Sequence, residues 1–372
     1  MRDNKILLIF DPANQKHLVA SILYQMRLKG IQIDSFNSYE WVYVSTDKDI
    51  PLFFRLLRPF LLKPKLDGLI RRLFQTLLLL YVSKPYDLVD IHFFWRGYVP
   101  FVKALKKPYK ITIWGSDFYR EKNEIQEIKK ALYAKAVLIQ VETEEVKSDV
   151  VSYYPALNSK IEVCNFGVDI LDKIDELRYR YPILKEKVEN RIVITCGYNA
   201  SEGQRHGVLL SIIASLPAKM KQHICICVPA TYGMTPSYEE KLKRELEQVN
   251  VPYKLFDKRL SEEGLALLRI CSDIVLNIQI TDTLNSSLIQ HLYAGGILLV
   301  GEWLKYGIYD RNNIYYHKVS LENLREMIIS CIENFEKERD LALRNRERVK
   351  KFASWDSLSN KQFEIYKKIL MN

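Results

Sequence analysis

The sequence predicts an α/β protein made of two doubly wound domains, and three observations support this prediction. The chain has 372 residues, which is more than one typical hydrophobic core accommodates. Short apolar runs alternate with segments of helical periodicity along most of its length. These runs are continuously hydrophobic, as strands are when both faces of a parallel sheet are covered.

The expected strands form one set in each half of the chain. In the first half they are residues 5–10, 31–36, 88–94, 109–115, 137–142 and 161–166. In the second half they are residues 191–198, 223–229, 253–258, 273–279, 297–301 and 313–318. The helical patterns between them make each half a Rossmann-like unit, in which ligands bind at the carboxyl ends of the strands.

A charged segment without strand character, residues 171–190, lies between the two halves. We therefore expect an N-terminal domain over residues 1–170, a linker over 171–190 and a C-terminal domain over 191–352. The helical pattern breaks around residues 352–359 and resumes in a last helix over 360–371.

Composition narrows the classes of function. The chain is 48% hydrophobic and 27% charged, which is typical of a globular protein. Its net charge of +10 suits a phosphorylated ligand, an anionic membrane surface or nucleic acid. No nucleic-acid-binding motif and no metal-ligand spacing is present, so we expect neither nucleic acid nor a metal. The apolar run before Asp11 is too short for a signal peptide. Most of the six cysteines lie in apolar, strand-like runs without metal-ligand spacing, which favours reduced, buried thiols and a cytoplasmic protein.

The most informative window is residues 281–296, TDTLNSSLIQHLYAGG. Asp282 opens a polar turn, a helix pattern follows, and Gln290 lies eight positions after Asp282, before paired glycines. A turn that leads into a helix presents N–H groups and the positive end of the helix dipole, which suits phosphate. Asp282 and Gln290 flank that position with groups that bind hydroxyls, so the window predicts a nucleotide-sugar site. The alternative is an ordinary αβ unit whose helix is capped by serine.

Two further loops follow predicted strands. In residues 197–207, Gly197 and Asn199 can adopt left-handed backbone angles. Arg205 lies near the start of the next helix and is a good partner for diphosphate oxygens. The alternative is a polar connection with an incidental arginine.

In the first half, Asp117 follows a strand in residues 114–120, WGSDFYR, and is expected to project into a cleft. The alternative is that Asp117 caps the following helix. In the loop after the first strand, Lys16 is a candidate contact for substrate.

Residues 51–86 are unusually basic and apolar, and they contain a single acid. An apolar stripe with helical spacing is formed by Leu66, Leu69, Ile70, Leu73 and Leu77. Arginines accompany it, namely Arg55, Arg58, Arg71 and Arg72. This combination is typical of helices that lie in the headgroup plane of an anionic membrane. The alternative is a pair of core helices with solvated arginines.

Together these features resemble the GT-B glycosyltransferases, especially the retaining enzymes of sugar-transferase family four. That family carries a Glu, seven residues and a second Glu, followed by a small-residue element and an apolar strand. The matching string here is Asp282-TLNSSLI-Gln290, followed by HLYAGG and ILLV. Residues 165–169 (NFGVD), 114–117 (WGSD) and 352–358 (FASWDSL) resemble other elements of the family.

The resemblance implies two facing Rossmann-like domains and a C-terminal helix, residues 353–372, that crosses back to the first domain. It also implies that Asp282 contacts the hydroxyls of the donor sugar and that Gln290 binds ribose. The diphosphate would be held by Arg205 and by the turn of Thr283, Leu284, Asn285, Ser286 and Ser287. The sequence departs from the family at both glutamates and at Tyr198, where arginine is usual. Some related transferases invert, so the stereochemistry stays open.

We therefore expect a nucleotide-sugar-dependent glycosyltransferase, of retaining type, that needs neither metal nor cofactor. It would add a sugar to a lipid-linked or surface-polysaccharide precursor while bound peripherally to the inner face of the cell membrane. Asp117 would orient the reacting sugar or accept a proton. One alternative is a nucleotide-sugar 2-epimerase of the same fold, and another is a non-catalytic membrane-associated scaffold.

Overall fold

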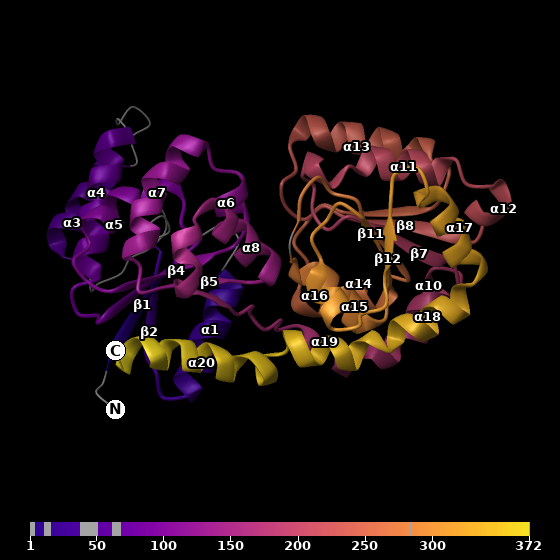
Figure 1. The fold of residues 1–372 in the computed structure, drawn as a ribbon. Helices are drawn as coiled ribbons and strands as arrows, with labels where there is room; N and C mark the ends of the chain where they lie inside the picture. The colour runs from indigo at the N-terminus through magenta and orange to yellow at the C-terminus, as the bar shows by residue number, and fades with distance from the viewer. Residues whose placement is uncertain (1–3, 11–15, 38–50, 62–67, 283, 372) are drawn as a thin grey trace. The chain divides into compact units, whose positions relative to one another are not determined.

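A computed structural model describes residues 4–10, 16–37, 51–61, 68–282 and 284–371. Its contacts divide the chain into two compact units. The first unit contains Met1–Gly167 and Leu358–Asn372, and the second contains Val168–Ser357. Each unit is a parallel sheet with helices packed on it (Figure 1).

The first unit has a six-stranded sheet in the order β2-β1-β3-β4-β5-β6, and every neighbouring pair is parallel. Its strands are β1 Lys5–Ile9, β2 Gln32–Phe36, β3 Leu88–His92, β4 Tyr109–Ile113, β5 Leu138–Val141 and β6 Ile161–Val163. Its helices are α1 Lys16–Leu28, α3 Leu52–Leu61, α4 Gly68–Val82, η1 Arg96–Tyr98, α5 Val99–Ala104, α6 Ser116–Tyr119, α7 Asn123–Lys135, α8 Glu144–Tyr153 and η2 Pro155–Lys160.

The central strands of this sheet are buried at every position, which explains their continuous hydrophobicity. They also bury a charged cluster. The Nζ atom of Lys110 lies 3.0 and 2.9 Å from the two carboxylate oxygens of Asp90, and His92 Nε2 lies 3.2 Å from Oδ2. Burial opposes ionisation of Asp90, but Lys110 and His92 together hold the pKa of Asp90 well below its usual value. Asp90 is therefore a buried carboxylate with a full set of partners.

The second unit has a six-stranded parallel sheet in the order β12-β11-β10-β7-β8-β9. Its strands are β7 Ile192–Cys196, β8 Ile224–Pro229, β9 Tyr253–Phe256, β10 Ile274–Asn277, β11 Ile297–Gly301 and β12 His317–Val319. Its helices are α9 Leu171–Leu177, η3 Arg178–Arg180, α10 Tyr181–Lys187, η4 Glu202–Gln204, α11 His206–Ala214, α12 Ala218–Lys221, α13 Pro236–Gln248, α14 Glu262–Cys271, α15 Ser286–Ala294, α16 Gly307–Arg311, α17 Leu324–Glu333, α18 Phe335–Leu343 and α19 Asn345–Ala353. The long helix α20, Trp355–Met371, starts in this unit and continues in the first.

Each expected strand overlaps an observed strand, although the last one is shifted from residues 313–318 to β12. The expected break at residues 352–359 is confined to Ser354, between α19 and α20. Ser354 has an extended backbone, and its hydroxyl accepts a hydrogen bond from the backbone N–H of Ser357 at 3.3 Å. This is a helix N-cap, so α20 begins earlier than expected.

The expected linker, residues 171–190, lies inside the second unit instead. It forms α9, η3 and α10. The buried side chains of α9 are Leu171, Ile174 and Leu177, which pack in the same apolar cluster as helix α15. The charged residues that suggested a linker belong to a helical segment whose apolar side is covered. The chain passes between the units at residues 167–168 and 357–358.

Among the described residues, no helix combines the length and the apolar character that crossing a bilayer requires.

Candidate functional site

The topology of the second sheet singles out one position for a ligand. Strand order runs outward from β7 to β8 and β9, and then reverses to β10, β11 and β12. In open α/β sheets ligands bind outside the carboxyl ends of the strands at such a reversal. The loops that follow β7 and β10 are residues 197–205 and 278–285, and both contain residues predicted from the sequence.

Gly197 makes the tight turn at the end of β7. Its φ is +66°, and a Cβ atom there would lie 2.8 Å from Gln204 Oε1 and 2.9 Å from His206 Nε2. The same Gln204 oxygen accepts a hydrogen bond from the backbone N–H of Tyr198 at 3.2 Å. Any larger residue at position 197 would displace these side chains, so the loop requires glycine.

Asn199 shapes the same loop. Its Oδ1 accepts a hydrogen bond from the backbone N–H of Ser201 at 2.8 Å, and its Nδ2 donates to the hydroxyl of Tyr232 at 3.2 Å. Asn199 is buried, and its φ is not among the positive values. Its structural role is therefore an Asx-type turn and not the left-handed backbone that its residue type suggested.

Arg205 precedes helix α11, as the sequence predicts, and has a left-handed backbone with φ of +57°. Such angles are costly for a residue other than glycine and are found often at functional sites. Its guanidinium carbon lies 5.3 Å from the centre of the Trp303 ring. None of the described carboxylates lies within 4 Å of the Arg205 guanidinium, so its charge is available to an anion. The cation–π contact holds the side chain in place.

Asp282 is half-buried, and its Oδ2 accepts hydrogen bonds from three side chains. The donors are Gln279 Nε2, Asn285 Nδ2 and the hydroxyl of Tyr306. Gln279 also joins the first loop, because its Oε1 accepts from Gln204 Nε2 at 2.9 Å. The loops after β7 and β10 thus share one hydrogen-bond network, and Asp282 has a fixed orientation within it.

Asn285, and not a serine, caps helix α15. Its Oδ1 accepts from the backbone N–H of Leu288 at 2.8 Å. Ser286 is exposed and Leu284 is half-buried. Ser287 is buried, and its hydroxyl has no hydrogen-bond partner among the described residues. Thr283 lies outside the described residues.

The other end of α15 also follows the prediction. The helix stops at Gly295, whose φ of +92° is left-handed. Gln290 lies within the helix and is buried, and its Oε1 accepts a hydrogen bond from Arg269 Nε at 2.9 Å. Arg269 comes from α14 and carries no signal in the sequence, because it occupies a helical position among apolar residues.

Tyr306, Trp303 and Gln279 also carry the network and were not predicted. The hydroxyl of Tyr306 accepts from Asn277 Nδ2 at 2.9 Å, and Trp303 Nε1 donates to the backbone oxygen of Gln279 at 2.8 Å. Trp303 and Tyr306 follow β11, the strand beside β10. Their position after a predicted strand is the signal that could have identified them.

Asp117 belongs to the first unit, and its orientation differs from the prediction. Its side chain is 2% exposed and does not project from the loop. Its Oδ2 accepts from the backbone N–H of Phe94 at 2.9 Å and its Oδ1 accepts from that of Trp114 at 2.8 Å. Burial raises the pKa of Asp117 to about 6, although Lys129 and these N–H groups favour its charged form. The carboxylate therefore holds together the loops that follow β3 and β4.

The basic segment forms α3 and α4, and much of its apolar surface is uncovered. Arg55 and Arg72 are exposed, and Arg71 is half-buried. The side chains of Arg58 and Lys16 lie outside the described part of the chain. Large apolar side chains exposed on the two helices are Leu52, Phe53, Leu56, Ile70, Leu73, Leu77 and Tyr81.

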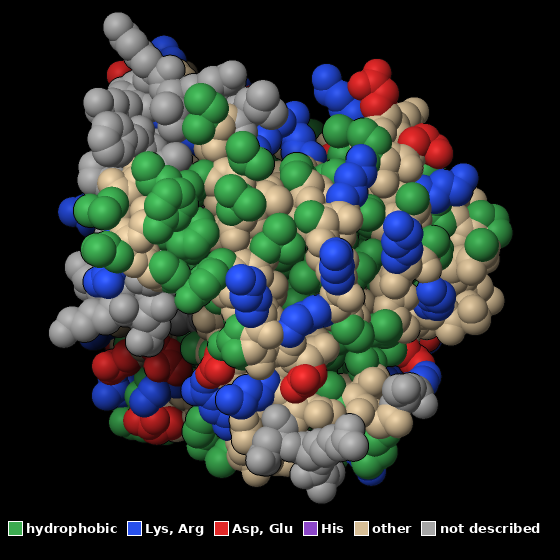
Figure 2. Space-filling view, turned by 90° about the vertical axis from the view of Figure 1, so that its left-hand side faces the viewer, with side chains coloured by type: hydrophobic (Ala, Val, Ile, Leu, Met, Phe, Trp, Pro, Cys, Tyr) green, Lys and Arg blue, Asp and Glu red, His purple; other side chains and the backbone are tan. Residues whose placement is uncertain are grey.

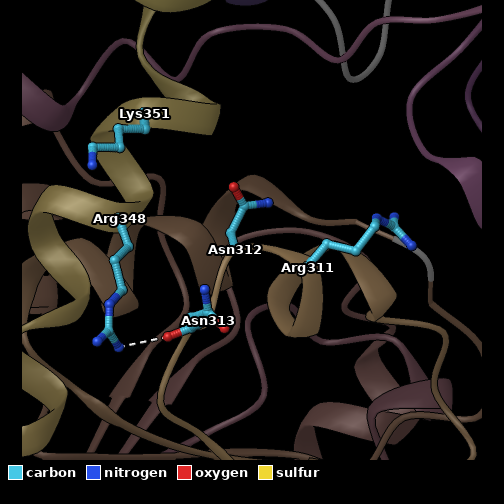
Figure 3. A pocket seen from close by; sticks show the side chains of 5 residues that line it. All are labelled: Arg311, Asn312, Asn313, Arg348 and Lys351. Carbon is cyan, nitrogen blue, oxygen red and sulfur yellow. Dashed lines mark hydrogen bonds between the residues drawn. The ribbon is translucent and has the colours of Figure 1, made fainter.

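Two other features of the second unit lie apart from the predicted residues. A cavity of about 580 Å³ is lined by basic and amide side chains, in which Arg348 donates to the backbone oxygen of Asn313 at 2.5 Å (Figure 3). One group of potential metal ligands occurs among the described residues, namely His317, Cys331 and Glu338. They come from β12, α17 and α18, so spacing in the sequence could not reveal them. His317 Nε2 and Glu338 Oε2 are already 2.7 Å apart.

No protein-family model matches the sequence, and no curated protein matches it either. Solved structures do match over the whole chain. A glycosyltransferase from Rickettsia africae has a TM-score of 0.74 at 16% identity, with 99% of each chain covered. HepE from Anabaena in complex with UDP has a TM-score of 0.70 at 12% identity, with 98% of this chain and all of HepE covered. Sucrose-phosphate synthase from Thermosynechococcus elongatus has a TM-score of 0.71 at 11% identity, with 99% of each chain covered.

These similarities extend across both units and the helix that joins them. Since sequence identity is low in every case, they establish the architecture of the chain and not its reaction. The protein has the GT-B fold of the glycosyltransferases that it resembles.

Proposed function

We propose that the protein is a glycosyltransferase that takes a sugar from a nucleotide-sugar donor. The observation that carries this proposal is the meeting of three strand-end loops, after β7, β10 and β11, at the start of α15. They bring together an arginine without a described acid partner, an oriented carboxylate and the N-terminus of a capped helix. HepE, which has the same fold, has been solved with UDP and with UDP-glucose.

In this proposal, Arg205 and the N–H groups at the start of α15 neutralise the diphosphate as it leaves the sugar. Preorganised positive groups of this kind stabilise developing charge without a metal. Asp282, held by its three donors, accepts hydrogen bonds from hydroxyls of the donor sugar. We propose retention at the reacting carbon because the family that the sequence resembles retains the configuration there.

Asp117 has a different place in the proposal. A pKa of about 6 is well suited to proton transfer near neutral pH. Both of its oxygens nevertheless accept backbone hydrogen bonds. We therefore favour a role in which Asp117 shapes the acceptor side of the first unit over direct proton transfer.

We further propose that α3 and α4 bind the inner face of the cell membrane, where a lipid-linked or surface-polysaccharide precursor would be the acceptor. Ile70, Leu73 and Leu77 form one stripe of α4 and are 48 to 59% exposed. Figure 2 looks at the side of the molecule where α3 lies and shows apolar side chains gathered there, with Lys and Arg nearby. Apolar side chains beside exposed Arg55 and Arg72 fit an anionic headgroup layer better than a core helix.

A ligand panel and a reaction assay test this proposal. Thermal unfolding with nucleoside diphosphates and nucleotide-sugars should show a specific increase in midpoint for one base. A labelled nucleotide-sugar should then pass its sugar to lipid-linked acceptors. Formation of an epimer without any acceptor would instead establish the 2-epimerase alternative. Absence of any nucleotide effect would favour the scaffold alternative.

A further inference from the structure

Arg269 is a buried cation whose observed partners are neutral. Its side chain is 5% exposed. Its Nε lies 2.9 Å from Gln290 Oε1, and its NH1 lies 2.7 Å from His291 Nε2. Burial and the neighbouring Arg269 hold the pKa of His291 well below its usual value, so the imidazole is neutral. None of the described carboxylates lies within 4 Å of this guanidinium, although buried arginines are usually paired with an acid.

The contact fixes the direction in which the Gln290 amide faces. A guanidinium can only donate hydrogen bonds, so the carbonyl oxygen of Gln290 must face Arg269. The amide NH₂ group then points to the other side and can donate to a ligand. A glutamate at this position would offer acceptor oxygens instead. The exchange of Glu for Gln therefore reverses the polarity of the hydrogen bond that this position offers.

The same side of α15 carries a second sign of a ligand. Ser287 and Gln290 are three positions apart and so lie on one face of the helix. The Ser287 hydroxyl is buried and has no partner among the described residues. Buried hydroxyls are almost always hydrogen-bonded, and a bound polar group would satisfy this one.

We infer that Arg269 is a positioning residue that turns Gln290 into a hydrogen-bond donor toward the ribose of a nucleoside diphosphate. This inference rests on the proposed function and adds a chemical requirement to it. The ribose must present an oxygen that accepts a hydrogen bond from Gln290.

The test compares UDP with 2′-deoxy-UDP and 3′-deoxy-UDP, and it uses the corresponding ADP and GDP series if those bases bind better. For the wild type, removal of the accepting hydroxyl should weaken binding about 3- to 10-fold, the effect of one hydrogen bond. In Arg269→Met the Gln290 amide is no longer oriented, so this ratio of dissociation constants should fall toward one. In Arg269→Lys a donor and the positive charge remain, so the ratio of dissociation constants should lie between those of Arg269→Met and the wild type.

The ratio separates positioning from folding, because a merely structural defect would weaken the binding of UDP and of its deoxy forms equally. Arg339→Met is the matched control. Arg339 is largely buried in the same unit and pairs with Asp273 at 3.1 Å, and this variant should keep the wild-type ratio. If the wild type binds a nucleoside diphosphate and Arg269→Met keeps the full ratio, the role of Arg269 is refuted. If the wild type binds no nucleoside diphosphate, the proposed function fails and the inference fails with it.

Discussion

The hydroxyl of Tyr366 donates a 2.6 Å hydrogen bond to the carboxylate of Asp90, although 276 positions separate them in the chain. Both side chains are fully buried. A second polar contact also joins helix α20 to the first sheet. The side-chain amides of Gln140 and Gln362 exchange hydrogen bonds of 2.9 and 3.2 Å. Helix α20 is thus joined to the middle of the first sheet by polar groups as well as by apolar packing.

We expect Tyr366→Phe to lower the free energy of unfolding of the first unit by about 1.5 to 3 kcal/mol, the usual contribution of a hydrogen bond to a charged group. The reason is that Asp90 loses one of the donors that satisfy its buried charge. Denaturant unfolding checks this, with Tyr24→Phe as the control because Tyr24 is exposed. Equal stability of the two variants would show that the hydroxyl contributes nothing.

Gly197→Ala should destabilise the second unit by more than the roughly 1 to 2 kcal/mol that a left-handed alanine costs. The added Cβ would meet Gln204 Oε1 and His206 Nε2 at less than 3 Å. Gly30→Ala is the matched control, because Gly30 has a φ of +81° but no atom near its Cβ position. If Gly197→Ala and Gly30→Ala lower the thermal unfolding midpoint equally, the loop after β7 accommodates the added Cβ without further loss of stability.

Stability should fall as the pH rises from about 4 to about 6, because of Asp117. Its pKa in the folded protein is raised to about 6, above the ordinary value of an aspartate. An acid whose pKa is raised in the folded protein contributes stability while it is protonated. This contribution is lost as the pH rises through the folded pKa. Urea unfolding across this range, followed by tryptophan fluorescence, measures the slope. Asp117→Asn should flatten it while lowering stability overall, since an amide cannot accept from both N–H groups.

Arg205→Ala should weaken binding of a nucleoside diphosphate by about tenfold or more, because a charged hydrogen-bond partner contributes about 1.5 to 3 kcal/mol. Calorimetric titration with UDP, ADP and GDP measures the loss. Arg325→Ala is a suitable control, since Arg325 is exposed and its partners, Ser215 and Glu326, lie outside the proposed site. A wild-type dissociation constant in Arg205→Ala would remove this arginine from the donor site.

Flotation with anionic liposomes tests the α3–α4 surface. The wild type should float, and Leu73→Ser with Leu77→Ser should reduce the bound fraction because both exposed side chains lose their apolar contact. Replacement of Arg55 and Arg72 by Glu should release the protein, mainly at low salt. Ile183→Ser, which removes an exposed apolar side chain from the second unit, should have no effect. Flotation that is indifferent to all these changes would refute the membrane proposal.

The sequence predicted the strands well, and with them the loops that follow β7 and β10, because buried parallel strands and the turns after them leave local signals. It could not predict how side chains engage one another across the fold. Asp117 was expected to project, but its orientation depends on the N–H of Phe94, 23 positions away. Likewise the role inferred for Arg269 depends on its contact with Gln290, which lies on another helix. The prediction of a linker over residues 171–190 was wrong for the same reason. The sequence displays the charge of this segment but not the packing of its apolar residues against the second unit.

The first unit is discontinuous, because it consists of Met1–Gly167 and of residues that begin at Leu358. A ribosome therefore finishes all six strands of its sheet long before it makes the helix that carries Tyr366. Until then Asp90 lacks its tyrosine donor and Gln140 lacks its amide partner, and the whole second unit is synthesised in between. The first unit can reach its final state only after the residues from Leu358 onward have been synthesised. Premature termination before residue 358 would therefore leave a nascent domain with unsatisfied buried polar groups, which chaperones and proteases would recognise.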